Sequence, residues 1–147
     1  MIYASRKEAF TLIELLLSVS LIALMAAISV PVYQSFQVGN DLDVAVNTIA
    51  QSLRRAAALS QASDGDISWG LFIESGRITL FKGLSYLSRD PNFDEVFDLA
   101  TSITPSGLSE IVFSKFSGDP QVVGDITLTT ADEFRTISIN SKGAVLY

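Results

Sequence analysis

One carboxylate stands far from every charged residue that follows it in this sequence. No charged residue occurs between Glu14 and Asp41, and residues 15–32 are apolar apart from three serines and one proline. An ionised carboxylate inside hydrocarbon costs about 2.5–3.5 kcal/mol on membrane-insertion scales, so it needs a partner or a route to the interface. Glu14 is therefore the leading candidate for a specific contact, and the alternative is that its side chain reaches the lipid headgroups.

The residue types that the chain lacks exclude much of enzyme chemistry. The sequence contains no histidine and no cysteine. Their absence removes the Ser-His-Asp and Cys-His arrangements, most zinc sites and the usual general base. Only carboxylates, lysines and hydroxyls remain as candidate catalysts, and no glycine-rich phosphate loop occurs. We therefore expect neither an enzyme nor a cofactor.

Acidic residues gather in two places, which raises the question of calcium binding. One group lies at residues 90–98 and a smaller one at residues 64–66. Neither has the spacing of an EF-hand loop, and a solvated acidic face is the simpler interpretation. If calcium binds, Asp90 and Asp94 are the first candidates.

The charge balance argues against nucleic acid as a partner. The 147 residues include 10 basic and 16 acidic side chains, for a net charge of −6. Such a surface repels phosphate backbones. The length allows one modest globular unit besides a membrane segment.

The apolar stretch is long enough to cross a bilayer as a helix. About 20 residues are needed, and residues 10–40 provide them. The serines can hide their hydroxyls by bonding back to carbonyls four residues earlier. A buried helix of a soluble protein is the alternative, but a head this small could not cover it on all sides. Pro31 should kink the helix, because it lacks an N–H and its ring crowds the preceding turn.

Helical periodicity continues beyond the apolar stretch and then gives way to alternation. Spacings of three and four predict an amphipathic helix over residues 41–62, with a buried stripe formed by Leu42, Val46, Ile49, Leu53 and Ala57. From residue 67 to 147, short runs of alternating apolar and polar residues predict strands, with turns at Ser75-Gly76 and Gly118–Pro120. The alternation is weaker over residues 83–105, where we expect an irregular segment with one short strand around residues 96–99. The helix stripe should cover an antiparallel sheet of four or five strands, which makes the fold class α+β.

The segment before the apolar helix differs from an ordinary secretory signal. It reads Arg6-Lys7-Glu8-Ala9-Phe10-Thr11-Leu12-Ile13-Glu14, so a charged leader is followed at once by the hydrophobic region. In a secretory signal the apolar region precedes the cleavage site and is removed. Here the chain resembles the type IV prepilins and the pseudopilins of type II secretion, whose motif is a basic leader, a small residue and Phe-Thr-Leu-Ile-Glu.

This resemblance implies a processing route. It implies that residues 1–9 are a leader, that a prepilin peptidase cuts between Ala9 and Phe10, and that the new amine of Phe10 is methylated. The family usually has glycine where this chain has Ala9, so processing here should tolerate the next smallest side chain. Arg6 and Lys7 favour a cytoplasmic N-terminus. The resulting domains are the leader, a membrane and filament-core helix over residues 10–40, and a head over residues 41–147.

The same resemblance implies a role in assembly for Glu14. Four residues of helix place it about 6 Å along the axis from Phe10, on the same face. In a filament Glu14 should meet the Phe10 amine of a neighbouring subunit. The implied partners are prepilin peptidase, other pilin or pseudopilin subunits, the assembly platform, and the lipid bilayer before assembly. The implied location is the inner membrane, with the head outside, and then the filament.

The head has a weaker resemblance to the H-type minor pseudopilins. The helix end around Ser52–Ala58 and the following hairpin carry it, and it implies architecture only. A structural filament subunit is thus the leading hypothesis. A membrane-tethered binding or sensing domain is the alternative, and the sequence does not separate a surface pilus from a secretion pseudopilus.

Overall fold

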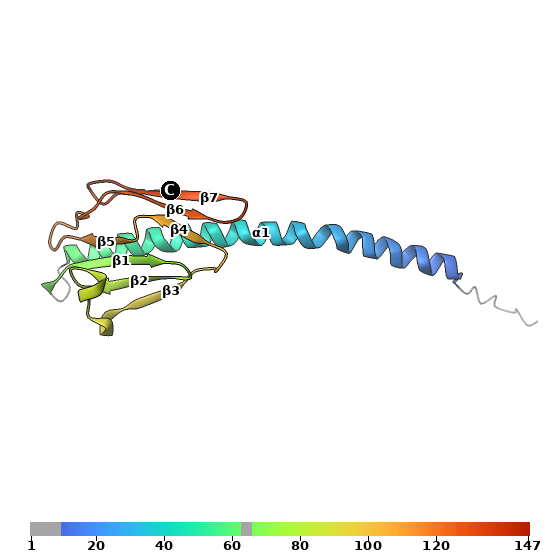
Figure 1. Cartoon of the computed structure of the whole chain (residues 1–147), viewed down its shortest axis with the longest axis horizontal. Coiled ribbons are helices and arrows are strands. Elements are labelled where there is room, and N and C mark those ends of the chain that lie inside the picture. The colour runs from blue at the N-terminus through green and yellow to red at the C-terminus, as the bar shows by residue number, and fades with distance from the viewer. Residues whose placement is uncertain (1–9, 63–65) are drawn as a thin grey trace, which may run out of the picture. The chain divides into compact units, whose positions relative to one another are not determined.

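The computed structural model describes residues 10–62 and 66–147 (Figure 1). Its elements are, in chain order, α1 (Leu12–Gln61), β1 (Trp69–Glu74), β2 (Arg77–Lys82), the 3-10 helices η2 (Tyr86–Ser88) and η3 (Pro91–Phe93), β3 (Glu95–Asp98), β4 (Thr104–Gly107), β5 (Glu110–Phe113), β6 (Gly124–Thr129), β7 (Phe134–Ile139) and β8 (Val145–Leu146). The chain divides into two compact units, of which the second is Val38–Tyr147. Each unit is described separately below.

The first unit contributes the N-terminal part of α1. The helix begins at Leu12, and its assignment is unbroken through Pro31 and Gly39. The proline therefore does not end the helix, and a bend at this position stays a prediction. One stretch, Leu12–Ser29, is long and apolar enough to cross a membrane, as judged by length and composition alone.

The serines of this stretch satisfy their hydroxyl groups within the helix, as predicted. Ser18 donates to the carbonyl of Glu14 at 2.8 Å, and Ser29 donates to the carbonyl of Met25 at 2.8 Å. Ser20 bonds three residues back instead of four, to Leu17 at 2.9 Å. Each bond hides a hydroxyl that would otherwise face hydrocarbon.

The second unit contains two four-stranded antiparallel sheets, not the single sheet predicted. The first has the order β3-β2-β1-β5, and the second has the order β4-β6-β7-β8. The split arises because the chain leaves the first sheet after β3 to form β4, returns for β5, and leaves again for β6. Strand alternation predicts which residues face a core, but it does not predict which strands pair.

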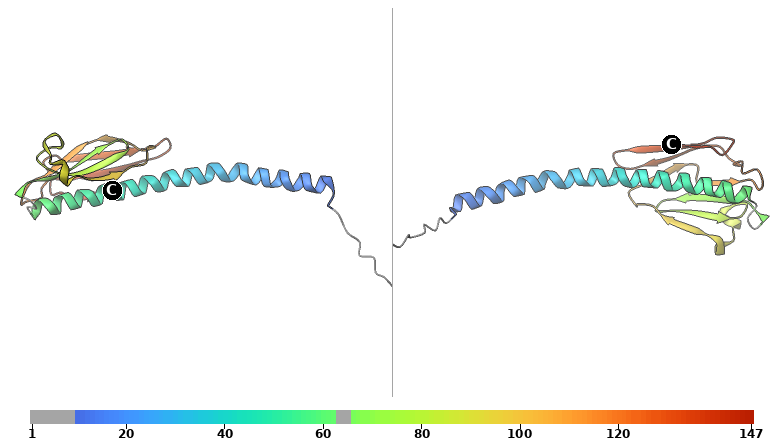
Figure 2. Two further views of the ribbon diagram at one scale, coloured as in Figure 1. Left: turned by 90° about the horizontal axis from the view of Figure 1, so that it is seen from below. Right: turned by 180° about the vertical axis from the view of Figure 1, so that it is seen from behind.

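The C-terminal part of α1 covers one face of both sheets. Figure 2 shows this part of the helix on one side of the second unit, with the strands on the other. Leu42, Ile49 and Leu53 have no exposed surface, Val46 is buried, and Ala57 is half-buried, so the predicted stripe is confirmed. These side chains form one hydrophobic cluster with residues of both sheets, including Leu71, Ile111, Ile126 and Ile137. The observed class is α+β, as predicted.

A hydrogen bond joins the end of α1 to the start of the first sheet. The hydroxyl of Ser60, which is fully buried, accepts from the backbone N–H of Trp69 at 2.9 Å. The carbonyl of Ser60 also accepts from the N–H of Phe116 at 3.0 Å. These two bonds fix the helix end against the strands that follow.

The first sheet is covered on its second face as well, which the sequence did not indicate. Thr79 and Phe81 are buried, so β2 is not the half-exposed strand that its alternation predicts. Tyr86 in η2 stacks on Phe72 at 3.9 Å between ring centroids and meets Phe81 edge-on at 5.7 Å. The segment after β2, which was expected to be irregular, thus covers this face of the sheet through the ring contacts of Tyr86.

One strand lies where no strand was predicted. β4 contains Pro105 and ends at Gly107, which are poor strand residues. It is tolerated because β4 is the edge strand of its sheet, where a missing N–H can face away from the ladder. Gly107 has φ +87, and an added Cβ would lie 2.3 Å from the carbonyl oxygen of Asp125. Only glycine allows this close approach of the two strands.

Candidate functional site

The first turn of α1 is built around two polar residues. Thr11 immediately precedes the helix, and its side-chain oxygen accepts from the backbone N–H of Glu14 at 3.3 Å. Its carbonyl accepts from the N–H of Leu15 at 3.1 Å, which closes the first helical bond. Thr11 is therefore the N-cap. The Thr-x-x-Glu spacing of a capping box could have revealed this role from the sequence.

Glu14 lies in this first turn with its side chain exposed. A carboxylate at a helix N-terminus is stabilised by the partial positive charge of the unpaired N–H groups. Within the part of the chain that the structure describes, no salt bridge to Glu14 is found.

The helix surface around Glu14 is apolar and open. All side chains of Leu12–Ser29 are exposed, including Leu12 at 77% and Ile13 at 72%. Phe10, just before the helix, is 80% exposed. Such a surface is unfavourable in water and is suited to lipid or to other apolar helices.

Three of the predicted site residues lie outside the described residues. They are Arg6 and Lys7 of the leader and Ala9 of the predicted cleavage site. The structure does place Phe10, on the other side of that bond, outside the helix. Its separation from Glu14 in sequence remains four, but the two do not share helical geometry, because the helix begins between them. In the described chain the predicted 6 Å rise between them therefore does not apply.

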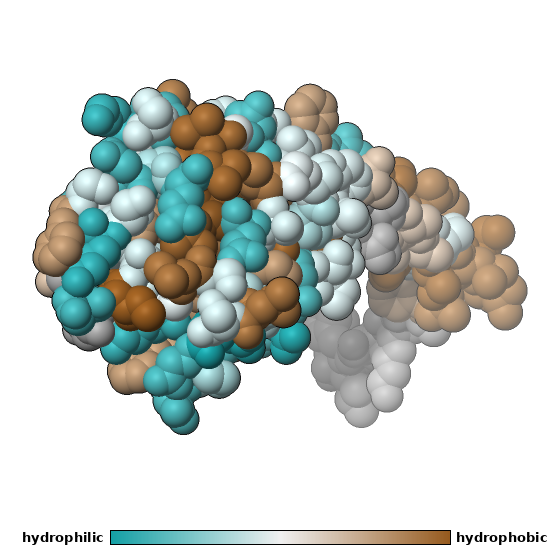
Figure 3. Space-filling view, turned by 60° about the vertical axis from the view of Figure 1, so that its left-hand side comes forward, coloured by the Kyte–Doolittle hydropathy of each residue, from teal (hydrophilic) through white to brown (hydrophobic). Residues whose placement is uncertain are grey.

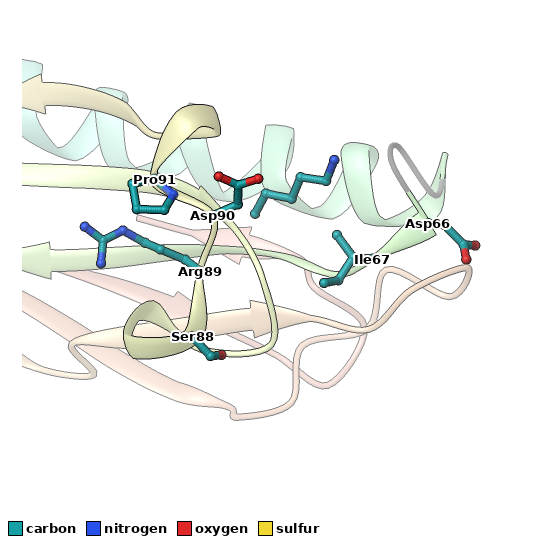
Figure 4. Close-up of a pocket in the computed structure, with 7 residues that line it drawn as sticks. Asp66, Ile67, Ser88, Arg89, Asp90 and Pro91 are labelled. Carbon is teal, nitrogen blue, oxygen red and sulfur yellow. The ribbon is translucent and has the colours of Figure 1, made fainter.

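The second unit has a cleft beside η2 and η3 (Figure 4). Its volume is about 550 Å³, and its lining residues are Asp66, Ile67, Lys82, Ser88, Arg89, Asp90 and Pro91. The side chains of Asp66 and Arg89 point in opposite directions in Figure 4. Asp66 pairs with Lys115, while Arg89 pairs with Asp94 at 2.8 Å. The charged groups therefore have partners elsewhere and do not converge on a ligand.

The weak calcium candidates also have other partners. Asp90 accepts from the backbone N–H of Asn92 at 3.1 Å and caps η3. Asp94 accepts from Arg89, and this hydrogen bond raises the pKa of the guanidinium above its ordinary value, so Arg89 stays charged. Among residues 10–62 and 66–147, no group of three or more acidic residues is placed to hold a metal ion.

Hydrophobic side chains are spread over the surface of the second unit. Figure 3 shows a band of them on one face, interrupted by polar side chains. Leu87 is 96% exposed, and Leu84, Phe93 and Val96 are also exposed. Three aromatic residues, Trp69, Phe81 and Phe113, are buried, so they serve packing and do not add to this surface.

Comparison with known proteins identifies a sequence motif and a similar fold. Residues 4–30 match the prokaryotic N-terminal methylation motif. The fold is similar to that of the minor pseudopilin EpsH from the Type 2 Secretion System of Vibrio cholerae, with a TM-score of 0.55 and 12% sequence identity. This match covers 72% of the present chain and 94% of that one. At this identity, the second match establishes similarity of fold.

Proposed function

We infer that this chain is a pilin or pseudopilin subunit, because a prokaryotic N-terminal methylation motif and the fold of a minor pseudopilin occur together in it. Both findings support the type IV pilin and pseudopilin family, whose members are structural proteins. The observation that carries the inference is the motif at residues 4–30, which runs directly into an exposed apolar helix. The family implies processing by a prepilin peptidase and assembly with other subunits, and the apolar helix fits a membrane-anchored protein.

The processing step that we propose is cleavage of the bond between Ala9 and Phe10. Removal of residues 1–9 takes away Arg6 and Lys7 and leaves the apolar helix attached to the head. The amine of Phe10 then becomes the new N-terminus and receives a methyl group. The exposed position of Phe10, before the first turn of the helix, is compatible with both reactions.

We further propose that the precursor lies in the inner membrane with its N-terminus in the cytoplasm. Basic residues are retained on the cytoplasmic side, and Arg6 and Lys7 lie a few residues before the apolar segment. The head is then outside, where the assembly platform can transfer the subunit from the bilayer into a pilus or pseudopilus.

Assembly would rest on Glu14 and on the apolar helix surface. Transfer from lipid into a filament replaces hydrocarbon with neighbouring helices, so the apolar side chains stay out of water. Glu14 then gains a counter-charge from the Phe10 amine of a neighbouring subunit, which relieves the cost of an unpaired carboxylate. This pairing favours one axial stagger between subunits over others.

The test is the chemical identity of the mature N-terminus in the membrane and filament fractions. Mass spectrometry should find N-methylated Phe10, and a labelled head should be found in isolated filaments. An intact Met1 on chains in the membrane fraction would instead support a membrane-tethered binding or sensing domain. The type of filament that carries the label distinguishes a surface pilus from a secretion pseudopilus.

A further inference from the structure

One side chain caps the position at which α1 begins. The hydroxyl of Thr11 accepts from the N–H of Glu14, and the first regular bond of the helix runs from Leu15 to the carbonyl of Thr11. Phe10 and Thr11 both lie outside the helix. An N-cap residue has non-helical backbone geometry, so the cap holds the preceding residue out of the helix.

The sequence before Thr11 does not by itself prevent a longer helix. Residues 1–10 contain no glycine and no proline, the two residues that most oppose helix formation. Ser5 and Glu8 also repeat the Ser-x-x-Glu pattern of a capping box, six residues earlier than Thr11 and Glu14. The sequence thus contains two capping-box patterns, and α1 starts at the later one, with Thr11 as its cap.

The choice of helix start determines how accessible the proposed cleavage site is. If the helix began at Ser5, the carbonyl of Ala9 would accept from the N–H of Ile13, and the bond to Phe10 would lie inside a helical turn. A peptidase must reach the carbonyl carbon of this bond, and helical turns around it block that approach. Exposed segments outside regular structure are the preferred sites of proteolysis.

We propose that Thr11 is a positioning residue for leader removal by the prepilin peptidase: its side chain starts α1 at Leu12 and so keeps Phe10, whose backbone nitrogen belongs to the bond to be cut, outside the helix. This inference rests on the proposed function, because it concerns the same processing step. It assigns to Thr11 a role that is separate from that of Glu14, whose carboxylate is not needed for the bond to its own backbone N–H.

The experiment measures kcat/KM for leader release from the full-length chain in detergent or vesicles, using purified prepilin peptidase. Thr11→Val keeps the size and branching but removes the acceptor, and it should lower kcat/KM about fivefold, which corresponds to about 1 kcal/mol of capping free energy. Thr11→Ser and Thr11→Asn retain a cap, and they should stay within about twofold of the wild type.

A second substitution tests the mechanism directly. Glu8→Gly removes the competing upstream start and adds a helix breaker, so alone it should change kcat/KM by less than about twofold, and combined with Thr11→Val it should restore cleavage. NMR chemical shifts of Phe10 should become helical in Thr11→Val and return to non-helical values in the double variant. These shifts report on the helix start and are independent of the peptidase.

The outcomes separate this inference from the function on which it rests. A wild-type chain that is not cut after Ala9 would overturn the proposed processing itself. Normal cleavage of Thr11→Val, an equal loss in Thr11→Ser, or slow cleavage of Thr11→Val with Phe10 still non-helical would each overturn the role of Thr11 and leave the proposed function intact.

Discussion

Within its own subunit, the Glu14 carboxylate is stabilised mainly by the dipole of the helix in whose first turn it lies. Its side chain is exposed in the first turn of α1, where the helix dipole contributes about 0.3–1 kcal/mol. This is less than the cost of about 2.5–3.5 kcal/mol of placing a charge in the hydrocarbon core. The difference favours any arrangement that brings a cation to Glu14, and the Phe10 amine of a neighbour is the one that the processing step would create.

The first prediction at this scale separates insertion from assembly. Glu14→Leu removes a charge that is unfavourable in lipid, so membrane insertion and leader cleavage should be unharmed. Incorporation into filaments should fall, because the neighbour's amine would be buried without a counter-charge, a loss of about 3–5 kcal/mol. The measurement co-expresses both chains and compares their ratio in sheared filaments with that in the membrane pool.

The matched control for this measurement is Ser18→Leu. Ser18 is exposed, lies one turn further along the same helix and satisfies its own hydroxyl through the carbonyl of Glu14. The substitution makes the segment more apolar without removing a charge, so it should be incorporated like the wild type. If Glu14→Leu also enters filaments in proportion to its membrane pool, the pairing mechanism is wrong.

A second prediction at the residue scale concerns the residue before the proposed cut. Ala9→Leu should stop maturation, because the peptidase subsite beside the bond has to accept this side chain, and the precursor should accumulate at full length. Ala9→Gly, the residue usual in the family that the motif resembles, should be processed at least as fast as the wild type. Gel mobility and mass spectrometry of the membrane fraction measure both, and normal processing of the leucine variant would place the cut elsewhere.

At the scale of elements, glycine geometry predicts which turns and strands resist substitution. Gly76 in the turn between β1 and β2 has φ +86, and an added Cβ there meets no atom within 4 Å. Gly107 has nearly the same φ, but a Cβ would approach the carbonyl oxygen of Asp125 to 2.3 Å. Both positions impose the same backbone strain, and only Gly107 adds a collision with a neighbouring strand.

We therefore expect Gly107→Ala to be much more destabilising than Gly76→Ala. The turn variant should lose about 1–2 kcal/mol of unfolding free energy from strain alone. The strand variant should lose a further 1–3 kcal/mol, roughly, because β4 must move away from β6. Urea unfolding of the head gives both values, and equal losses would show that β4 is not held against β6 as described.

The elements that were predicted from the sequence are those that depend on residues close to one another along the chain. The stripe from Leu42 to Ala57 follows from helical spacing, and the hairpin of β1 and β2 follows from the Ser75-Gly76 turn between two alternating runs. Strand pairing is not local, so the division into two sheets was missed. β4 was missed because Pro105 and Gly107 oppose strand formation except at an edge, and only the pairing with β6 makes it an edge.

The sequence singled out two candidate site residues, whose roles stay predictions. Glu14 is an isolated acid beside an apolar run, and Phe10 follows from the resemblance of the motif. The role of Thr11 as a helix cap has a local signal, its spacing to Glu14, but the same residue is also part of the prepilin motif, which by itself predicts no cap. The cover that Tyr86 gives to the first sheet has no local signal, because stacking on Phe72 depends on how the loop folds back.

The whole molecule combines one helix surface that needs apolar neighbours with a head that has its own core. The buried hydrophobic residues of the described chain begin at Leu42. They include side chains of α1 and of both sheets in one cluster, all within the unit Val38–Tyr147. The surface that needs lipid or other subunits, Leu12–Ser29, lies in the other unit. Association and folding are thus assigned to different parts of the sequence.

The last prediction follows from this division. A fragment comprising residues 38–147 should fold on its own, because it keeps the whole hydrophobic cluster, and it should be monomeric, because the exposed apolar helix has been removed. Within this fragment, Leu53→Ala should lower the unfolding free energy by about 2–5 kcal/mol, because Leu53 is fully buried. Gln51 is exposed on the same helix, so the control Gln51→Ala should change the unfolding free energy by less than about 0.5 kcal/mol. Near-UV circular dichroism during heating measures folding, and sedimentation measures the oligomeric state. The packing of α1 on both sheets is what gives the head a single stable structure. A fragment without a cooperative transition, or equal effects of the two substitutions, would therefore contradict the helix-on-sheet core.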